Sequence, residues 1–148
     1  MTTELQFRRY EPADRSSCLA LFDENCPAFF VPNERADYVE LLSRRTQNYF
    51  VCLLNDRIVG AYGLCPLDSG GAALHWIMLS PSAQGVGLGS AIMARVLDDL
   101  RSSARSTLHI SASHKSAPFF AKFGAVEIST TTDGWGPGMH RVEMRLVL

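Results

Sequence analysis

A glycine-rich segment near the middle of the chain has residue types that can bind an anion. Gly85, Gly87 and Gly89 fall within five positions, between a strand-like run and a helical pattern. Glycines at this density lose much conformational entropy on folding, a cost that is offset where the backbone must approach a ligand closely. Their N–H groups can converge at the helix N-terminus, where the helix dipole also favours negative charge. The segment predicts a pyrophosphate cradle, and a tight turn without a ligand is the alternative.

The spacing of these glycines separates the segment from the common phosphate-binding loops. Neither GxGxxG nor GxxxxGK[ST] is present. The pattern Gln84-x-x-Gly87-x-Gly89 instead resembles the Q/R-x-x-G-x-G/A motif of the GNAT N-acetyltransferases, and Leu79-Ser80-Pro81 is similar to that family's V-x-P. A second stretch, Ser116–Ala125, resembles the family signature A-x-x-F-Y-x-K-x-G-F. The resemblance extends over essentially the whole chain.

The resemblance implies acetyl-coenzyme A (acetyl-CoA) as co-substrate, bound where the fourth and fifth strands splay apart, and no metal. Backbone groups at Met78 and Leu79 would bind the pantetheine arm, the amides of residues 84–90 the pyrophosphate, and Phe120 would pack against the pantetheine. The cations available for the 3′-phosphate are Lys115, Lys122 and Arg95. The residues expected to bind the cofactor are Met78, Leu79, Gln84, Gly85, Val86, Gly87, Leu88, Gly89, Ser90, Phe119 and Phe120.

Acyl transfer from a thioester to an amine requires a neutral amine, so a base is useful. An amine with a pKa of about 10.4 costs roughly 4.6 kcal/mol to deprotonate at pH 7. His75 is the first candidate, and strand alternation predicts that it shares a face with Ala73, Ile77 and Leu79. In register with the motif, it matches a histidine that arylalkylamine acetyltransferases use in proton removal, while the glutamate position of histone-type members falls on Ala73. A hydrogen-bonded core histidine is the alternative.

The acid that protonates the leaving thiolate is less critical, because a thiol has a pKa near 8.5. The tyrosine that many family members use for this step aligns with Phe120, which has no hydroxyl. Ser113, His114 and water are substitutes by position, and His140 in the last strand is another. The catalytic candidates are therefore His75, Ser113 and His140.

Three features are candidates for the acceptor side of the site. The carboxylates of Glu24, Glu34 and Asp133 lie near elements that, by the resemblance, border the acceptor cleft and would attract a cationic amine, although solvated surface charges are the alternative. Residues 27–32, with Phe29, Phe30 and Val31 between two prolines, are too apolar for a solvated loop and are expected to line something. Residues 133–138, glycine-rich with a tryptophan, predict a mobile wall of the acceptor pocket or a plain hairpin connection.

The elements that position these residues follow from hydrophobic periodicity and turn residues. Asn55-Asp56 suits a two-residue hairpin turn, and two connections that run through a helix favour parallel neighbouring strands. The helix that begins after Asn33 is expected to turn Ala36, Val39, Leu41 and Leu42 inward. Strands are predicted at 5–10, 49–54, 57–64, 72–79, 106–112, 126–131 and 139–148, and helices at 12–26, 34–45, from after 89 to about 105, and 116–123.

These elements predict an α/β (α+β) fold of the GNAT type. The expected sheet is mixed and mostly antiparallel, with six to seven strands and about four helices, and it splays between strands 4 and 5. A chain of 148 residues, 47% of them hydrophobic, fits one domain over residues 1–148. The formal net charge is −1 with scattered Lys and Arg residues, which argues against a nucleic-acid groove or a polybasic membrane patch.

The cysteines and the N-terminus bear on compartment. Four cysteines show neither CxxC spacing nor histidines at zinc-ligand spacing, which argues against a metal site. The chain has no apolar stretch of about 18 residues and no signal-like start. We therefore expect a cytoplasmic protein with free, mostly buried thiols.

Taken together, the sequence predicts an acetyl-CoA-dependent N-acetyltransferase. It would transfer the acetyl group directly to a primary amine of a small molecule or a protein, as a monomer or a homodimer. The alternative is a non-catalytic acyl-CoA sensor that acts on a protein partner, which the missing tyrosine at Phe120 favours. Use of a longer acyl group is a third hypothesis.

Overall fold

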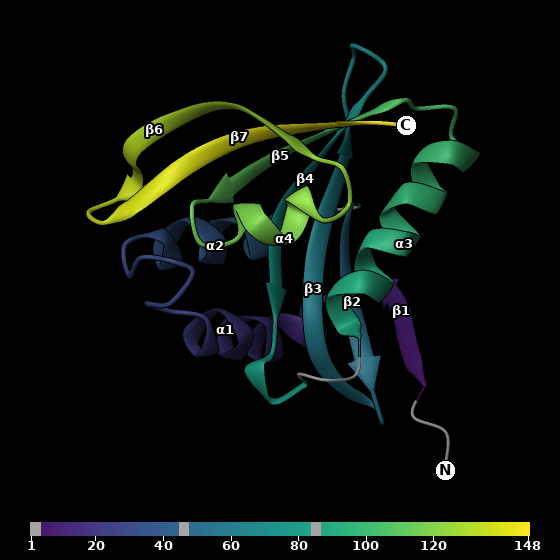
Figure 1. Ribbon diagram of the computed structural model, residues 1–148. Coiled ribbons are helices and arrows are strands. Elements are labelled where there is room, and N and C mark those ends of the chain that lie inside the picture. Colours follow the sequence, from purple (N-terminus) through teal and green to yellow (C-terminus); the bar gives the residue numbers. More distant parts are fainter. Residues whose placement is uncertain (1–3, 45–47, 84–86) are drawn as a thin grey trace.

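A seven-stranded sheet organises the chain (Figure 1). The computed structural model describes residues 4–44, 48–83 and 87–148. The strand order is β1-β2-β3-β4-β5-β7-β6, and every neighbouring pair is antiparallel except β4 and β5, which are parallel. The strands are β1 Leu5–Arg9, β2 Tyr49–Leu54, β3 Arg57–Pro66, β4 Ala72–Leu79, β5 Thr107–Ser113, β6 Val126–Gly136 and β7 Met139–Val147.

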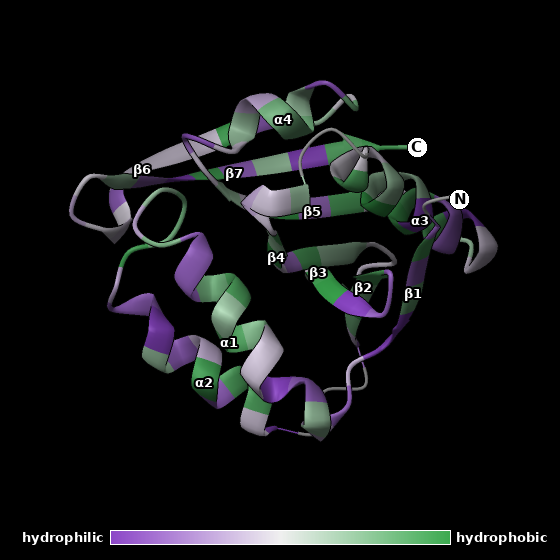
Figure 2. Cartoon of the chain, turned by 90° about the horizontal axis from the view of Figure 1, so that it is seen from below, coloured by the Kyte–Doolittle hydropathy of each residue, from purple (hydrophilic) through white to green (hydrophobic). Residues whose placement is uncertain are grey.

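Four α-helices in the described residues cover the two faces of this sheet (Figure 2). Helices α1 and α2 pack on one face, where buried residues such as Phe22 and Tyr38 form one core with Val51. Helices α3 and α4 pack on the other face, where Ile92 and Phe120 belong to a second, larger core. None of the helices in residues 4–44, 48–83 and 87–148 is both long and apolar enough to cross a bilayer. The helices are α1 Arg15–Glu24, α2 Glu34–Ser43, α3 Leu88–Ser102 and α4 Ala117–Ala121, with 3-10 turns at Pro12–Asp14 and Pro81–Ala83.

The hairpin between β2 and β3 confirms the predicted two-residue turn. Asn55 and Asp56 have φ angles of 52° and 63°, the left-handed conformation that such a turn requires and that these residue types tolerate. The parallel pairing predicted for the connection through α3 is also confirmed. The second prediction of this kind was wrong: β6 follows α4, but β7 inserts between β5 and β6 and pairs antiparallel with both.

The buried face of α2 differs from the predicted one. Glu34, Tyr38 and Leu42 are buried, whereas Ala36 is exposed. These three buried positions lie four residues apart and form one stripe along the helix. The prediction placed apolar residues inward by type and missed that a glutamate and a tyrosine occupy the stripe.

The sheet opens between β4 and β5, as predicted. The two strands pair only over Ala72–Leu74 and Leu108–Ile110. Beyond these residues β4 continues along β3 while β5 continues along β7, so the strands diverge (Figure 1). The opening exposes one edge of β4 from His75 to Leu79, where the sequence places the candidate catalytic chemistry.

Candidate active site

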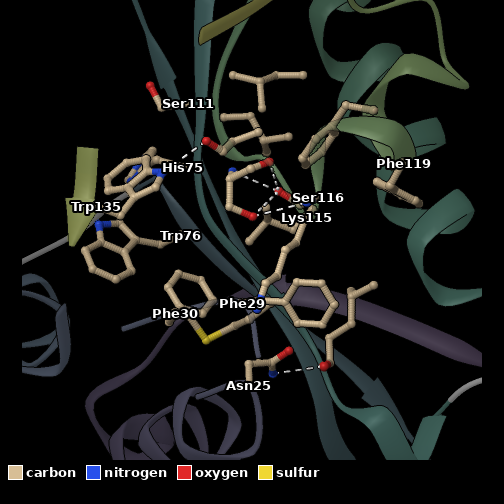
Figure 3. A pocket seen from close by; sticks show the side chains of 18 of the residues that line it. Asn25, Phe29, Phe30, His75, Trp76, Ser111, Lys115, Ser116, Phe119 and Trp135 are labelled. Carbon is tan, nitrogen blue, oxygen red and sulfur yellow. Dashed lines mark hydrogen bonds between the residues drawn. The ribbon is translucent and has the colours of Figure 1, made fainter. Parts of the chain in front are cut away.

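The opening between β4 and β5 holds a cavity of about 420 Å³ (Figure 3). Its walls come from β4, β5, the start of α4, the residues between α1 and α2, and Trp135 of β6. Phe29 and Phe30 are among the lining residues, which confirms that the apolar segment 27–32 lines something. One end of the cavity lies near the start of α3, and the other is bounded by aromatic side chains and Glu34.

A bulge in β4 determines which side chains face this cavity. Trp76 has a φ of 48°, and the register between β3 and β4 shifts between Ala61 and Gly63. The extra residue reverses the alternation of side chains, because two residues of β4 oppose one residue of β3. His75 and Trp76 therefore lie on the α1/α2 face, whereas Ile77 packs with the α3 core. The prediction that His75 shares a face with Ile77 and Leu79 was wrong for this reason.

Two buried tyrosines hold the bulge in place. The Tyr49 hydroxyl donates a hydrogen bond of 2.9 Å to the carbonyl oxygen of Trp76, and it lies 2.7 Å from the Tyr38 hydroxyl. Both tyrosines are fully buried. Because Tyr49 uses its proton on Trp76, the Tyr38 hydroxyl must be the donor to Tyr49. This chain of hydrogen bonds satisfies a carbonyl that the bulge takes out of the regular ladder.

His75 lines the cavity with its Nε2 atom buried and without a hydrogen-bond partner in the described residues. The ring lies directly over Gly63, where an added Cβ would come within 2.5 Å of Nε2. Burial lowers the pKa of His75, because desolvation penalises the imidazolium. The imidazole is therefore neutral at pH 7. The described residues offer no partner for Nε2 of the kind that a hydrogen-bonded core histidine would have.

The other two catalytic candidates lie in different surroundings. Ser113 lines the cavity, and its Oγ accepts the Ser116 N–H at 3.1 Å and lies 3.2 Å from the Ser116 hydroxyl, at the start of α4. His140 is not among the lining residues. Its Nδ1 accepts the N–H of Asp133 at 3.0 Å, and its ring lies 4.6 Å from that of His114. The structure therefore brings together His75 and Ser113, but not His140, around the cavity.

The start of α3 has the backbone geometry expected of an anion site. Gly87 caps the helix in the left-handed conformation with φ of 71°, and no side chain in the described residues bonds to this cap. An added Cβ at Gly87 would meet no atom of the described part of the chain within 4 Å. The N–H groups of Leu88, Gly89 and Ser90 belong to the first turn, which has no acceptor within the helix. Gln84, Gly85 and Val86, also expected to bind the pyrophosphate, lie outside the described residues.

Gly89 has a packing role in addition to any ligand contact. A Cβ at this position would lie 2.8 Å from the ring of Phe119, so only glycine lets α4 approach α3 this closely. Phe119 and Phe120 both line the cavity, and Phe120 is almost fully buried. The glycine spacing of the sequence thus serves helix packing as well as backbone exposure.

The residues expected to bind the pantetheine arm and the 3′-phosphate do not all lie at the cavity. Leu79 lines the cavity, but its carbonyl oxygen already accepts a hydrogen bond of 3.0 Å from the buried side chain of Asn25. Met78 also lines the cavity, and its side chain is buried in the α1/α2 core. Of the three candidate cations, Lys115 lines the cavity, whereas Arg95 lies over the Phe7 ring and Lys122 is not a lining residue.

Sequence reasoning missed Asn25 and Tyr49, which hold the β4 backbone from the α1/α2 face. Asn25 directly precedes Cys26-Pro27, and Tyr49 opens a strand, so neither has a local pattern that indicates a long-range hydrogen bond. The only signal was the residue type, because a polar side chain in an apolar stretch needs a partner when it is buried.

The three acceptor-side carboxylates are not equivalent. Glu34 lines the cavity and is 6% exposed. Glu24 accepts the Ser80 hydroxyl at 3.0 Å and is not a lining residue, and Asp133 is an exposed residue that accepts the Gly138 N–H at 2.8 Å. Residues 133–138 form the β6–β7 hairpin, the second of the two predicted alternatives, and the Trp135 indole N–H donates to the Ala112 carbonyl at 3.0 Å. Glu34 and Trp135 are therefore the acceptor-side candidates that line the cavity.

The acetyltransferase (GNAT) family model matches residues 18–125, which cover most of the chain. This chain belongs to that family. A search of curated protein sequences gave no match.

Solved structures share the fold along nearly the whole chain. A GNAT-family protein from Desulfovibrio desulfuricans has 26% identity and a TM-score of 0.77, over 97% of this chain and 99% of that one. Rv2747 from Mycobacterium tuberculosis, in complex with CoA and NLQ, has 20% identity and a TM-score of 0.72, with the same coverage. A ribosomal-protein-alanine N-acetyltransferase from Brucella melitensis has 20% identity and a TM-score of 0.69, again over 97% and 99%. The mixed sheet, splayed between β4 and β5, is therefore the GNAT fold.

Proposed function

We propose that this protein transfers an acetyl group from acetyl-CoA directly to a primary amine, as one acetyltransferase domain over residues 1–148. The observation that carries the proposal is the cavity between β4 and β5, which is lined both by Phe119, packed against Gly89 of α3, and by His75, whose Nε2 has no partner in the described residues. Membership of the GNAT family and a relative solved with CoA support it. The free thiols fit a reducing, cytoplasmic location.

The residues at the α3 end fit coenzyme A. The N–H groups of Leu88, Gly89 and Ser90 would hold the diphosphate, because a helix N-terminus offers unbonded donors and a favourable dipole. Among residues 4–44, 48–83 and 87–148, Gly87 leaves this approach open, since even a Cβ would meet no atom of them within 4 Å. The face of Phe119 and the backbone of β4 would flank the pantetheine arm. When bound, acetyl-CoA supplies an acetyl group activated as a thioester.

His75 would act as the base for the acceptor amine. Its neutral imidazole can take a proton from the ammonium form of the amine at Nδ1, directly or through one water, because burial keeps its pKa low and Nε2 is buried against Gly63. The neutral amine then attacks the thioester carbon, and formation of the C–N bond breaks the C–S bond. The Ser113 hydroxyl, or water, would relay the second proton of the nitrogen to the thiolate, since Phe120 has no hydroxyl to give.

Turnover can be tested by measuring release of the CoA thiol across a panel of amines, against a blank without amine. Binding of CoA alone is measured by isothermal titration. Thiol release that depends on an amine supports the proposal. CoA binding without turnover on a broad panel, with either acetyl or longer acyl thioesters, would instead favour an acyl-CoA sensor, for which the absence of a hydroxyl at Phe120 is the supporting observation.

The role of His75 has its own test. We expect His75→Ala to lower the rate more at pH 7 than at pH 9, because at high pH more of the amine is neutral without a base. The pKa of His75 is below its usual 6.5, so wild-type activity should persist below that pH before the imidazole protonates. A mutant-to-wild-type ratio that does not change with pH would remove His75 from the base role.

A further inference from the structure

Glu34 is a buried carboxylate that has no cationic partner in the described residues. Its Oε2 accepts the Val31 N–H at 2.9 Å, and burial raises its pKa. No ion pair involves it, and Lys115, the basic side chain among the described lining residues, is not paired with it. A buried charge without a partner is costly, so natural proteins rarely keep one without a ligand or a counter-charge. Glu34 faces the cavity, where a ligand can supply that counter-charge.

Aromatic rings surround the cavity beside this carboxylate. Phe29, Phe30, Trp76 and Trp135 all line it (Figure 3). Phe30 and Trp76 stack with centroids 5.9 Å apart and planes 7° apart, and the Trp135 indole is fixed by its hydrogen bond to Ala112. Flat apolar walls of this kind bind an apolar or aromatic body well, and they offer little to a polar one.

A contact between the β6–β7 hairpin and the loop before α2 spans the acceptor end of the cavity and limits the size of the ligand. Gly136, at the end of β6, packs against the loop before α2, where an added Cβ would lie 2.7 Å from Val31 Cγ2 and 3.2 Å from Asn33 Oδ1. In Figure 2 the tip of the β6–β7 hairpin lies beside that loop. A polypeptide threaded past Trp135 would have to break this contact, whereas a small molecule would not.

We infer that the acceptor is a small hydrophobic primary amine without a carboxylate, whose ammonium pairs with Glu34 while its apolar body lies between the aromatic rings. The inference rests on the proposed function and specifies its acceptor. A carboxylate on the ligand would be repelled by Glu34 and would have to be desolvated against the aromatic walls. Once the amine has entered as an ammonium, one proton leaves to His75 and the neutral nitrogen attacks; the second proton that the nitrogen loses as the C–S bond breaks passes through Ser113 or water to the thiolate.

The test compares phenethylamine with phenylalanine, which has the same ring and amine but adds a carboxylate. Binding to the CoA-loaded wild-type protein is measured by isothermal titration and by the fluorescence of the tryptophans that line the cavity, and KM is measured by thiol release. We expect phenethylamine to bind at least about tenfold more tightly, the scale of one hydrogen-bonded charge. Equal binding of the two, or tighter binding of an alanine-starting peptide, would overturn the inference.

Glu34→Gln gives a second test, because the amide oxygen can still accept the Val31 N–H. This variant should weaken phenethylamine binding by about tenfold or more and reduce the discrimination against phenylalanine, while CoA affinity stays unchanged. Glu40→Gln is the matched control on the same helix, since Glu40 is exposed and paired with Arg44 outside the cavity. Unchanged phenethylamine affinity in folded Glu34→Gln would overturn the inference.

The two proposals fail in different ways. Loss of amine discrimination in a protein that binds CoA and acetylates other amines would count against the role of Glu34 alone. Failure to bind CoA, measured without any amine, would count against the acetyltransferase function itself.

Discussion

Replacing Gly87 by Asp or Asn tests the diphosphate site at the start of α3. The two side chains have the same shape and differ in charge. Both tolerate the left-handed conformation better than other residues, so the strain of a φ of 71° is similar in each variant and cancels in their comparison. Since a Cβ at Gly87 would meet no atom of the described residues within 4 Å, neither side chain clashes with that part of the chain.

The charge difference sets the expected effect. A carboxylate about 6 Å from a diphosphate with about two negative charges is repelled by roughly 1.4 kcal/mol at the dielectric constant of water, about 80, and by roughly 2.8 kcal/mol at about 40, a value between water and a protein surface. These energies correspond to about a tenfold to hundredfold difference in affinity. Gly87 is exposed, so salt should screen much of the repulsion.

Isothermal titration of CoA into both variants, at low and high salt, measures the effect. We expect Gly87→Asp to bind CoA about tenfold to hundredfold more weakly than Gly87→Asn at low salt, and the gap to narrow at high salt. Pantetheine, which lacks the diphosphate, should bind the two variants equally. Equal CoA affinity in the two folded variants would refute the placement of the diphosphate at α3.

Three further predictions concern β4 and the thiols. In Gly63→Ala the new Cβ would lie 2.5 Å from His75 Nε2 and should displace the imidazole. We expect kcat/KM to fall by about tenfold or more while CoA affinity stays unchanged. An unchanged kcat/KM would mean that the position of the His75 ring does not affect catalysis. Tyr49→Phe should lower the free energy of unfolding, measured in urea, by about 1–3 kcal/mol, because the Trp76 carbonyl loses its hydrogen-bond donor. Tyr10→Phe, which removes a hydroxyl without a described partner, should lower it less. Equal losses would argue against a role of Tyr49 in holding the β4 bulge. Cys18 and Cys52 are buried, and burial raises the pKa of the Cys18 thiol to about 11 and that of the Cys52 thiol to about 12. At pH 8 a thiol reagent should therefore label no more than two cysteines in the native protein and all four after unfolding. Faster labelling of Cys18 and Cys52 would show that these cores open.

The bounds of β4 follow from its own residues, whereas the faces of its side chains depend on contacts with distant parts of the chain. The predicted strand, 72–79, has the same bounds as the observed one, Ala72–Leu79. It placed His75 on the wrong face relative to Ile77, because strict alternation assumes an unbroken strand and the bulge at Trp76 adds one residue. The hydrogen bond that holds this bulge comes from Tyr49, which is 27 residues away in the sequence. Nothing in the local pattern of β4 indicates it.

The candidate site shows the same division. Apolar character and flanking prolines were enough to predict that 27–32 lines something, since such a segment avoids water. Residue type and position do not distinguish Glu34 from Glu24 or Asp133, since all three are carboxylates near the expected cleft. Burial on one stripe of α2 distinguishes Glu34, and that stripe exists because α2 packs against α1 and the sheet.

The sequence by itself determined the features that depend on a few neighbouring residues: the Asn55-Asp56 turn, the glycine start of α3 and the family motif. Only the tertiary structure decided the β5-β7-β6 order, the face of His75 and the isolation of Glu34. The physical reason is that turn and helix preferences arise from local backbone sterics, whereas strand order, bulges and the burial of a charge arise from contacts between residues far apart in the chain.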